Sequence, residues 1–458
     1  MLAQTSPRSV DSLAPAPSSR SEPLHKRSTA EFRRLLGAAT SDDVLVRLAS
    51  NFLGVETPMR HYQLHGKLRT ALAWHTLPDF LAMQGLVVAG AVGSTGSGRH
   101  ASEELGVAEF ESLRLGRDLW LEIPKNLLIF VESEEGSSAQ RAVLRFEMDL
   151  MREGRVAVGA FHLDPHPRLL EDWFDYTRRA NPLRGRKLFA NGTLIEGRPE
   201  VERGRLFLPE VVRQRLDFAL RRFVSPATAR LAALGVRQRA GLILAGPPGT
   251  GKSTLGKELV ETLATSLLWI TPGDLSEAND VREAYEIARW LAPTVVFLED
   301  LDLVAESRER GNRGSMLGQL MNELDGGVGD HPVLTIATTN RLEVVEQAVS
   351  NRPGRFDQIL EIGPPDSVSR RGMLVHRLRN ADLAEDLLDW SCGLLEGATG
   401  AEIEEVANSA LAAAVFEEGA GESRPHITRS HLEEALERVS RHIADRKVGF
   451  DRPAARQR

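Results

Sequence analysis

The sequence predicts an α/β protein in which a parallel-sheet core is followed by a helical lid and preceded by a separate α+β N-terminal domain. Short apolar runs, such as GLILAG, TVVFLED and VLTIATTN, alternate with helical patterns between about residues 205 and 345. Strands separated by helices indicate crossover connections and therefore a parallel sheet. From about residue 365 to residue 445 the patterns are helical only. The earlier residues differ, with helical segments first and alternating strands later.

The composition is that of a folded protein with more than one domain. The chain has 458 residues, of which 42% are hydrophobic and 26% are charged. This length suggests two or three domains of ~100–200 residues each. The formal net charge of −7 argues against broad binding to nucleic acid, although a local basic groove remains compatible with it. We therefore expect no nucleic-acid partner.

Cysteine content and hydropathy bear on the compartment. Cys392 is the single cysteine, which excludes a disulfide framework or a multi-cysteine zinc site and fits a reducing interior. No apolar run approaches the ~20 residues that a membrane-spanning helix needs. The first residues contain no apolar stretch typical of a signal peptide. These features predict a cytoplasmic protein without a membrane span.

Five segments are expected along the chain. Residues 1–28 are rich in Ser, Pro, Ala and Arg and are predicted to be a disordered tail, with or without a role in docking a partner. Residues 29–196 are predicted to form the α+β domain, residues 197–364 the α/β core and residues 365–445 the helical lid. Residues 446–458 are predicted to be a flexible tail.

Strand patterns define the second half of the N-terminal domain. Between Leu144 and Leu150 apolar and charged residues alternate, which is typical of a half-buried strand. Residues 126–131 form a short apolar run of similar type, and Asn191-Gly192 is typical of a hairpin turn. The glycine-rich stretch 93–100 lacks a Lys-Ser/Thr pair, which favours a mobile loop over a phosphate site.

Two further clusters in this domain each have a functional and a plain interpretation. His162, Asp164 and His166 alternate like metal ligands, but two prolines and the lack of a further ligand favour an irregular loop. Residues 178–187 contain five Arg or Lys residues, which form either a solvated face or a contact for an anionic partner. The solvated face is the favoured interpretation.

A glycine-rich loop between an apolar strand and a helix carries the clearest chemistry. GPPGTGKS follows GLILAG and precedes TLGKELVETLA, which is the strand–loop–helix context of a G-x-x-x-x-G-K-[ST] phosphate loop. Glycines let several backbone N–H groups converge on an anion, and a helix N-terminus favours negative charge. Lys252 is expected to reach the outer phosphates, and the Ser253 hydroxyl is expected to ligate Mg²⁺. The residues expected to bind the nucleotide are Gly246, Pro247, Pro248, Gly249, Thr250, Gly251, Lys252, Ser253 and Thr254.

Acidic and amide side chains follow two other apolar strands. Glu299, Asp300 and Asp302 come directly after residues 295–298, and Asn340 ends TIATTN. Ligands in sheets of this kind bind at the carboxyl ends of the strands. Mg²⁺ needs an acidic neighbour, and hydrolysis needs a carboxylate to orient and deprotonate water. An amide at this place is suited to aligning the water and touching the γ-phosphate.

Two arginines lie in the turn NRPGRFD, after a helix-like stretch. One interpretation of Arg352 and Arg355 is structural. The other is a reach to the nucleotide of a neighbouring subunit, where a guanidinium stabilises transition-state charge and contributes ~10³–10⁵ in rate.

In their order along the chain, these motifs resemble the AAA family of the AAA+ ATPases. The resemblance covers about residues 200–442 and rests on GPPGTGKS, FLEDLD, LGQLMNELDG, ATTN and NRPGRFD. GATGAEIEEVANSAL and ITRSHLEEALERV resemble the family's helical lid and closing helix. The resemblance implies a P-loop parallel-sheet ATPase core with a C-terminal helical lid. It also implies ATP and Mg²⁺ as cofactors and assembly as a homo-oligomeric ring, commonly a hexamer.

The resemblance also implies roles for single residues. Lys252 and the backbone around it bind phosphate, Asn340 is the first sensor, and Arg352 and Arg355 are arginine fingers that act across the subunit boundary. The Gly400-Ala401 pair of the lid matches the branch in which no sensor arginine is expected. The N-terminal domain, residues 29–196, is expected to select a protein client.

The acidic pair departs from the family's usual Asp-Glu order, because here it is Glu299-Asp300. The apolar strand before the pair and Asp302 after it set the register. Glu299 is therefore assigned to the Mg²⁺ shell and Asp300 to water activation. Asp is one methylene shorter than Glu, so this base must sit closer to its water, and hydrolysis is expected to be slow rather than absent.

A second departure concerns the loop that precedes Tyr285. The family's peptide-threading members carry an aromatic-hydrophobic-Gly loop at this place, but residues 276–280 contain no aromatic side chain. Tyr285 falls on a helix face with apolar neighbours, which favours packing over a pore role. These residues leave threading by aromatic loops in doubt.

Three functions fit these features. The favoured one is ATP-driven remodelling of a protein or protein complex. The reversed acidic pair suggests an ATP-dependent regulatory or scaffold switch with slow hydrolysis. A motor on nucleic acid is disfavoured by the acidic net charge and by the lack of a recognisable binding module. No H-E-x-x-H protease motif occurs in the sequence.

Overall fold

The structure is a computed structural model, in which the chain divides into two compact units. The structure describes residues 44–450 except 56–58, 95–104, 107, 134–140, 149–154, 163–167, 198–205, 225–226, 237–238, 307–313, 326–330, 350–355, 357 and 420–423. The first unit consists of Met1–His65, Pro78–Glu111 and Pro124–Leu170. The second consists of Gly66–Leu77, Ser112–Ile123 and Glu171–Arg458.

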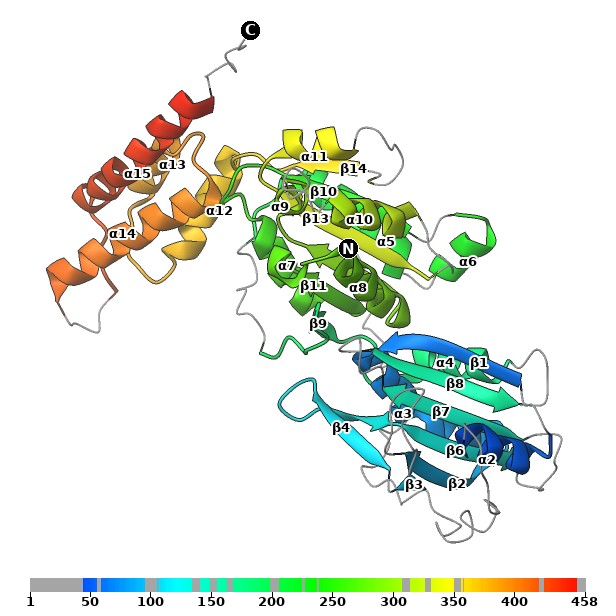
Figure 1. Ribbon diagram of the computed structural model, residues 1–458. Helices are drawn as coiled ribbons and strands as arrows, with labels where there is room; N and C mark the ends of the chain where they lie inside the picture. Colours follow the sequence, from blue (N-terminus) through cyan, green and yellow to red (C-terminus); the bar gives the residue numbers. More distant parts are fainter. Residues whose placement is uncertain are drawn as a thin grey trace, which may run out of the picture. The chain divides into compact units, whose positions relative to one another are not determined.

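The first unit is built on a six-stranded sheet in the order β1-β8-β7-β6-β2-β3 (Figure 1). Its strands are β1 (Met59–Gly66), β2 (Leu86–Ser94), β3 (Leu105–Gly106), β6 (Leu127–Ser133), β7 (Ala142–Met148) and β8 (Arg155–His162). The pairs from β8 through β7, β6 and β2 to β3 are antiparallel. Helix α2 (Val44–Leu53) packs on this sheet. The rings of Phe52 and Phe130 contact each other edge-on, with 5.1 Å between their centroids. The sheet and helix together give the α+β unit that the sequence predicts.

The alternating pattern around Leu144 forms a strand, as predicted. In β7 the side chains of Leu144 and Phe146 are buried, whereas Arg145 and Glu147 are half-buried. This alternation arises because successive side chains of a strand point to opposite faces of the sheet. The strand begins at Ala142 and its last residue is Met148.

Along the chain, the boundaries between the two units fall within or next to four elements. These are α3 (Lys67–Met83), β4 (Glu109–Arg114), β5 (Trp120–Lys125) and α4 (Leu169–Ala180). Within the second unit, the first part of α3 packs on α4. Trp173 Nε1 donates to the Ala73 carbonyl at 3.1 Å, and the hydroxyls of Thr76 and Thr177 lie 2.7 Å apart. All of these polar groups are buried and paired, so they hold the two helices in register.

The second unit contains a six-stranded sheet in the order β14-β10-β13-β12-β11-β9, and every strand pair in it is parallel. The strands are β9 (Lys187–Phe189), β10 (Arg239–Ala245), β11 (Ser266–Ile270), β12 (Thr294–Leu298), β13 (Val333–Thr339) and β14 (Gln358–Glu361). The parallel sheet predicted from alternating strands and helices is confirmed. β9 lies before the boundary expected at residue 196, so the sheet begins earlier in the chain than the sequence pattern indicates.

The attachment of β9 explains this difference. β9 pairs with β11, and Leu188 is fully buried. Lys187 Nζ donates to the carbonyls of Leu263, at 2.8 Å, and Thr265. The predicted turn at Asn191-Gly192 follows β9, where Phe189 N donates to the Thr193 carbonyl at 2.9 Å. A strand of three residues carries too little periodicity to be assigned to a sheet from sequence.

Two layers of helices cover the parallel sheet. The helices of this core are α5 (Glu210–Val224), α6 (Thr228–Ala233), α7 (Lys252–Thr262), the 3₁₀ turn η2 (Pro272–Asp274), α8 (Ala278–Trp290), α9 (Leu301–Glu306), α10 (Gly314–Asp325) and α11 (Leu342–Val349). Apolar residues of α5 and α7 form one core with alternate strand residues such as Leu244 and Phe297. On α8, Tyr285 is buried and its hydroxyl lies 2.8 Å from Thr335 Oγ1. The packing role expected for Tyr285 is therefore confirmed.

The C-terminal helices have their own core, and Figure 1 shows them as a separate group. They are α12 (Ser367–Arg377), α13 (Glu385–Leu394), α14 (Gly400–Glu418) and α15 (Arg429–Phe450). Asp366 caps α12 by accepting from Ser369 N at 2.7 Å, and Thr399 with Glu402 forms a capping box on α14. The helical lid is as predicted, but α15 continues to Phe450, beyond the boundary expected at residue 445. Among the described residues, no helix combines the length and apolarity needed to cross a bilayer.

Gly256 is a close contact on which the packing of α7 depends. A Cβ at this position would lie 2.5 Å from Phe297 Cε1 and 2.7 Å from Trp269 Cη2, both in the core. We expect Gly256→Ala to destabilise the second unit by ~1–3 kcal/mol, because the rings must move. Urea unfolding measures this change. The control is Gly318→Ala in α10, where nothing lies within 4 Å of the added Cβ. It should instead be neutral or slightly stabilising, and equal destabilisation by both changes would contradict the packing explanation.

Candidate functional site

The glycine-rich loop connects β10 to α7 and has the backbone that its glycines allow. Gly249 and Gly251 have φ values of 83° and 97°, in the left-handed region that favours glycine. A Cβ on Gly246 would collide with the carbonyl oxygen of Ile362. These three positions therefore need glycine for the loop to curl over the end of the sheet.

Lys252, the first residue of α7, is turned back onto this loop. Its Nζ donates to the carbonyls of Gly246 at 2.6 Å and Pro247 at 2.8 Å, and the side chain is buried. Burial lowers the pKa of Lys252 to about 8, although Asp300 and Asp302 act in the opposite direction. A desolvated ammonium next to a helix N-terminus fits the negative charge of a phosphate group.

The loop opens into a pocket of about 400 Å³, a size typical of small-molecule sites. Core and lid both line it, and the Ala401 N–H of α14 donates to the Gly249 carbonyl at 3.0 Å. Among the predicted residues, those that line it are Pro248, Gly249, Thr250, Gly251, Lys252, Ser253, Thr254, Asp300 and Asn340. The structure thus brings the phosphate loop, an acid and an amide from three different strand ends into one cavity.

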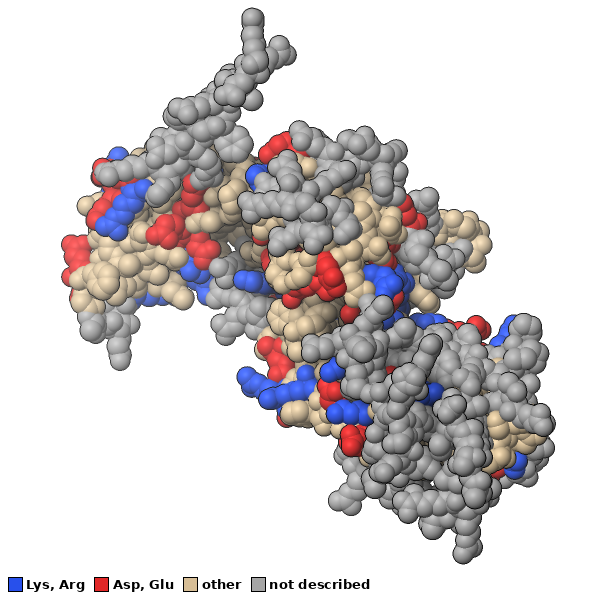
Figure 2. Space-filling view, viewed as in Figure 1, with Lys and Arg blue, Asp and Glu red and all other residues tan. Residues whose placement is uncertain are grey.

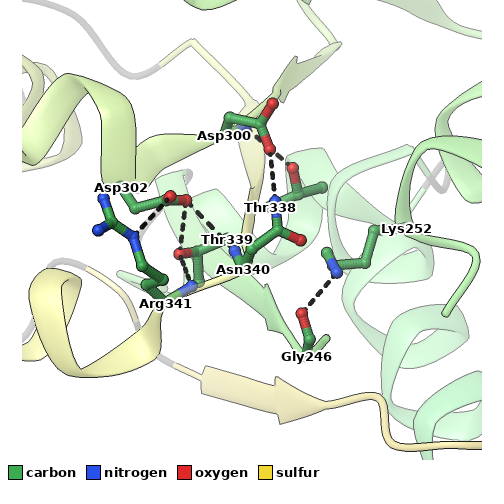
Figure 3. A network of polar contacts seen from close by, with 8 residues as sticks. All are labelled: Gly246, Lys252, Asp300, Asp302, Thr338, Thr339, Asn340 and Arg341. Carbon is green, nitrogen blue, oxygen red and sulfur yellow. Dashed lines mark hydrogen bonds and ion pairs between the residues drawn. The ribbon is translucent and has the colours of Figure 1, made fainter. Parts of the chain in front are cut away.

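Asp300 and Asn340 meet at this pocket (Figure 3). Asn340 Nδ2 donates to Asp300 Oδ1 at 3.2 Å, and the Asp300 amide donates to Thr338 Oγ1 at 3.1 Å. Asp300 has a φ of 47°, an uncommon backbone conformation that turns the chain at the strand end. Partial burial raises the pKa of the Asp300 carboxyl, and the neighbouring charges of Asp302 and Glu299 raise it further. Perturbed carboxyls of this kind are typical of functional sites.

Asp302 holds the segment that carries Asn340. Its Oδ1 accepts from Thr339 Oγ1 at 2.8 Å and from the Asn340 amide at 3.2 Å. Its Oδ2 lies 3.5 Å from Arg341 Nε, and the Arg341 amide donates to Thr339 Oγ1 at 3.0 Å. Figure 3 shows the contacts of Thr339, Asn340 and the Arg341 side chain converging on the buried carboxylate of Asp302. Asp302 therefore ties the end of β12 to the end of β13 and orients the amide that faces the pocket.

Glu299 lies beside the pocket and is half-buried. Its Oε2 accepts from Trp269 Nε1 at 3.3 Å. Ser253 is exposed in the first turn of α7. A carboxylate and a hydroxyl are the oxygen ligands that Mg²⁺ prefers, so the donor set fits the predicted metal. The assignment of Ser253 and Glu299 to Mg²⁺ remains a prediction.

Several predicted features fall outside the described residues or have ordinary contacts. Arg352 and Arg355 lie outside the described residues, as do Asp164 and His166 of the expected loop. In the described part of the chain no group of three metal-ligating side chains occurs. Within the basic run 178–187, Arg184 donates to the carbonyls of Arg178 and Arg179 at the end of α4, and Arg178 pairs with Asp175. The contacts of Arg178 and Arg184 fit the solvated face that was favoured for the run, whereas Lys187 at its end is half-buried and donates to the carbonyls of Leu263 and Thr265.

The sequence patterns missed the part of the pocket lining that lies outside the phosphate loop and the strand ends. Six of its residues are Leu206, Phe207, Met373, His376, Arg377 and Glu404. Arg377 Nη2 lies 3.1 Å from Glu404 Oε1 and its Nε donates to Asn408 at 2.8 Å. No motif indicates these residues, because they come from the segment before α5 and from two lid helices. The sequence could have indicated these residues in one way, through the expectation that the predicted helical lid folds back over the phosphate loop.

The fold and the site define a nucleoside-triphosphate-binding α/β domain with a helical lid. Residues 242–364 match the family model described as ATPase family associated with various cellular activities (AAA). Residues 242–364 therefore form an AAA ATPase domain, and ATP with Mg²⁺ is the cofactor pair that this family implies.

Curated relatives match just under half of the chain. The ATP-dependent zinc metalloprotease FtsH of Streptococcus pneumoniae is 35% identical over 223 residues, which cover 46% of this chain and 33% of the relative. FtsH of Thermotoga maritima is 34% identical over 219 residues, covering 45% and 35%. The mitochondrial inner membrane m-AAA protease component YTA10 of Saccharomyces cerevisiae is 35% identical over 227 residues, covering 45% and 29%. The chain thus spans about a third of the length of these relatives.

Asp302 offers a test of how the strand ends are held. We expect Asp302→Ala to lower ATP turnover by roughly 10-fold or more, because Asn340 loses its anchor and preorganised groups lose alignment. Affinity for ATP should change little, since Asp302 does not line the pocket. Steady-state kinetics and equilibrium binding separate the two effects. Asp302→Asn is the matched control, because it keeps an oxygen for Thr339 and Asn340. Wild-type turnover in Asp302→Ala would refute the positioning role.

Proposed function

We propose that the chain hydrolyses ATP and uses the energy to remodel a protein or protein complex. The observation that carries this proposal is the meeting of Lys252, Asp300 and Asn340 at one pocket between core and lid. A site that only binds ATP needs a cation such as Lys252. It does not need a carboxylate such as Asp300 that is oriented by the amide of Asn340. The names of the relatives, ATP-dependent proteases, support a protein as the client.

Each residue of the site has a proposed task. Lys252 and the backbone N–H groups of residues 249–254 bind the phosphates, and Asn340 orients the attacking water. Asp300 accepts a proton from that water, and its raised pKa favours proton acceptance. Ser253 and Glu299 would hold Mg²⁺, which when bound supplies positive charge next to the phosphates.

We further propose that the chain works as a ring, commonly of six copies in this family. Arg352 and Arg355 would then complete the site of the neighbouring subunit as arginine fingers. The N-terminal domain would select the client. Two features bear on how force reaches it: residues 276–280 contain no aromatic side chain, and Tyr285 is buried against β13. Action on a folded partner is thus favoured over threading through aromatic loops.

Two other functions remain as alternatives. The Glu299-Asp300 order favours a regulatory or scaffold switch, in which ATP binding assembles the ring and hydrolysis is slow. A nucleic-acid motor has less support. On the face shown in Figure 2, Lys and Arg side chains are interspersed with Asp and Glu over the coloured residues. ATPase rates measured with DNA and with candidate client proteins distinguish the three functions.

Asp300 provides the direct test of hydrolysis. We expect Asp300→Asn to bind ATP with nearly wild-type affinity, since the amide is isosteric and Lys252 is untouched. Turnover should fall by ~10²-fold or more, because an amide cannot accept the proton. Phosphate release and equilibrium binding are the measurements. Lys252→Ala is the contrasting variant and should lose affinity itself. Unchanged turnover in Asp300→Asn would remove Asp300 from the mechanism.

Mixing two inactive variants tests the shared site. Asp300→Asn retains Arg355, and Arg355→Ala retains Asp300, so a mixed ring contains some complete sites only if the arginine acts across the boundary. We expect the equimolar mixture to recover part of the wild-type ATPase rate, while each variant alone stays inactive. The control is each variant alone, measured at twice its concentration in the mixture so that the total protein concentration is the same. Absence of recovery in mixed rings shown to contain both variants would contradict the arginine-finger role.

A further inference from the structure

Trp269 contacts the two elements that carry the predicted metal ligands. It lies in β11 next to β12, its side chain is 8% exposed, and its Nε1 donates to Glu299 Oε2 at 3.3 Å. Its ring packs on Phe297 with 4.8 Å between centroids and a 50° tilt. The other edge of the indole faces α7, because a Cβ on Gly256 would lie 2.7 Å from Trp269 Cη2. α7 is the helix that carries Ser253. One rigid ring therefore spans from this helix to the Glu299 carboxylate.

A glutamate at this position needs such a contact more than an aspartate would. Its additional methylene adds a rotatable bond, so an unrestrained carboxylate samples several positions, and ordering it costs free energy. The indole N–H is a donor without acceptor capacity, so it neither binds a cation nor competes with one. It engages one carboxylate oxygen, Oε2, and Oε1 remains to face a cation or its water shell.

We propose that Trp269 is a positioning residue that orients Glu299 for Mg²⁺ bound together with the nucleotide. The extra length of Glu299 and the indole of Trp269 act as a matched pair. This inference rests on the proposed function only in that the pocket binds Mg²⁺ with ATP, and it does not require hydrolysis. The competing explanation is that Glu299 merely satisfies a buried indole N–H, which usually has a partner when buried.

Binding measurements separate these explanations without using activity. Calorimetry gives the affinity for ATPγS, a slowly hydrolysed analogue, in EDTA and in MgCl₂. We expect Trp269→Phe to match the wild type in EDTA, because the phosphate loop is unchanged. The gain in affinity on adding Mg²⁺ should shrink by ~10-fold, as is typical when the partner of a metal ligand is removed. Trp290→Phe is the matched control, since Trp290 is also buried, at 5% exposed, and should retain the full gain.

A second variant keeps the inference testable if Trp269→Phe loses stability. Glu299→Asp leaves the indole in place but withdraws the carboxylate from it. In the wild type, tryptophan fluorescence should change when MgCl₂ is added to the ATPγS complex, and Glu299→Asp should abolish this change. In the Glu299→Asp background, Trp269→Phe should have no further effect on the Mg²⁺ gain, which a double-mutant cycle measures.

The outcomes distinguish this inference from the function on which it rests. A full Mg²⁺ gain in folded Trp269→Phe, or an unchanged fluorescence response in Glu299→Asp, overturns the positioning role and leaves the proposed function intact. A wild-type protein that binds ATPγS equally in EDTA and in MgCl₂ removes the Mg²⁺ site, and the proposed role of Trp269 with it.

Discussion

The parallel pairing of β10 with β13, and of β13 with β12, is the constraint on which the site depends. Parallel neighbours place all of their carboxyl ends at one edge, so the phosphate loop, Asp300 and Asn340 meet although the sequence separates them. The register is specific, because Ala245 lies opposite Thr339 and Leu298 lies opposite Ala337. A slip by one residue would move every side chain of a strand to the opposite face of the sheet, and so against the other layer of helices. The packing of the core therefore also sets the spacing of the groups that are proposed to be catalytic.

Asp302 fixes the direction of the chain beyond the end of β13, which the pairing of the strands alone does not determine. The ladder ends before Asn340, and beyond it the chain would be free to turn in several directions. A buried carboxylate that accepts from Thr339 Oγ1 and the Asn340 amide removes that freedom. Hydrogen bonds to charged groups are the stronger ones, and a buried acceptor without a donor is costly. The same contacts that satisfy Asp302 hence preorganise the amide at the pocket.

The sequence was sufficient for most of the core and of the loop, because both depend on local patterns. Alternation in β7 and the glycines of residues 246–251 follow from strand geometry and from backbone conformations that neighbours in sequence decide. The position of β9 was not predictable, since three residues carry no periodicity and their place in the sheet depends on Lys187 and on contacts more than 70 residues away. The lid side of the pocket was missed for a similar reason. Arg377 and Glu404 face each other only after α12 and α14 have packed.

The helical lid is in direct contact with the phosphate loop. The Ala401 amide donates to Gly249, and a Cβ on Gly249 would lie 2.8 Å from Ala401 Cβ, so the lid rests directly on the phosphate loop. A nucleotide in the pocket would touch the loop on one side and lid residues such as Met373 on the other. A ligand shifts a conformational equilibrium only by its difference in affinity between the states. Because the lid supplies part of the pocket lining, the affinity for the nucleotide depends on how the lid is oriented relative to the core. With Tyr285 buried in the core, the proposed action on a folded partner would depend on this orientation of the lid and not on an aromatic pore loop.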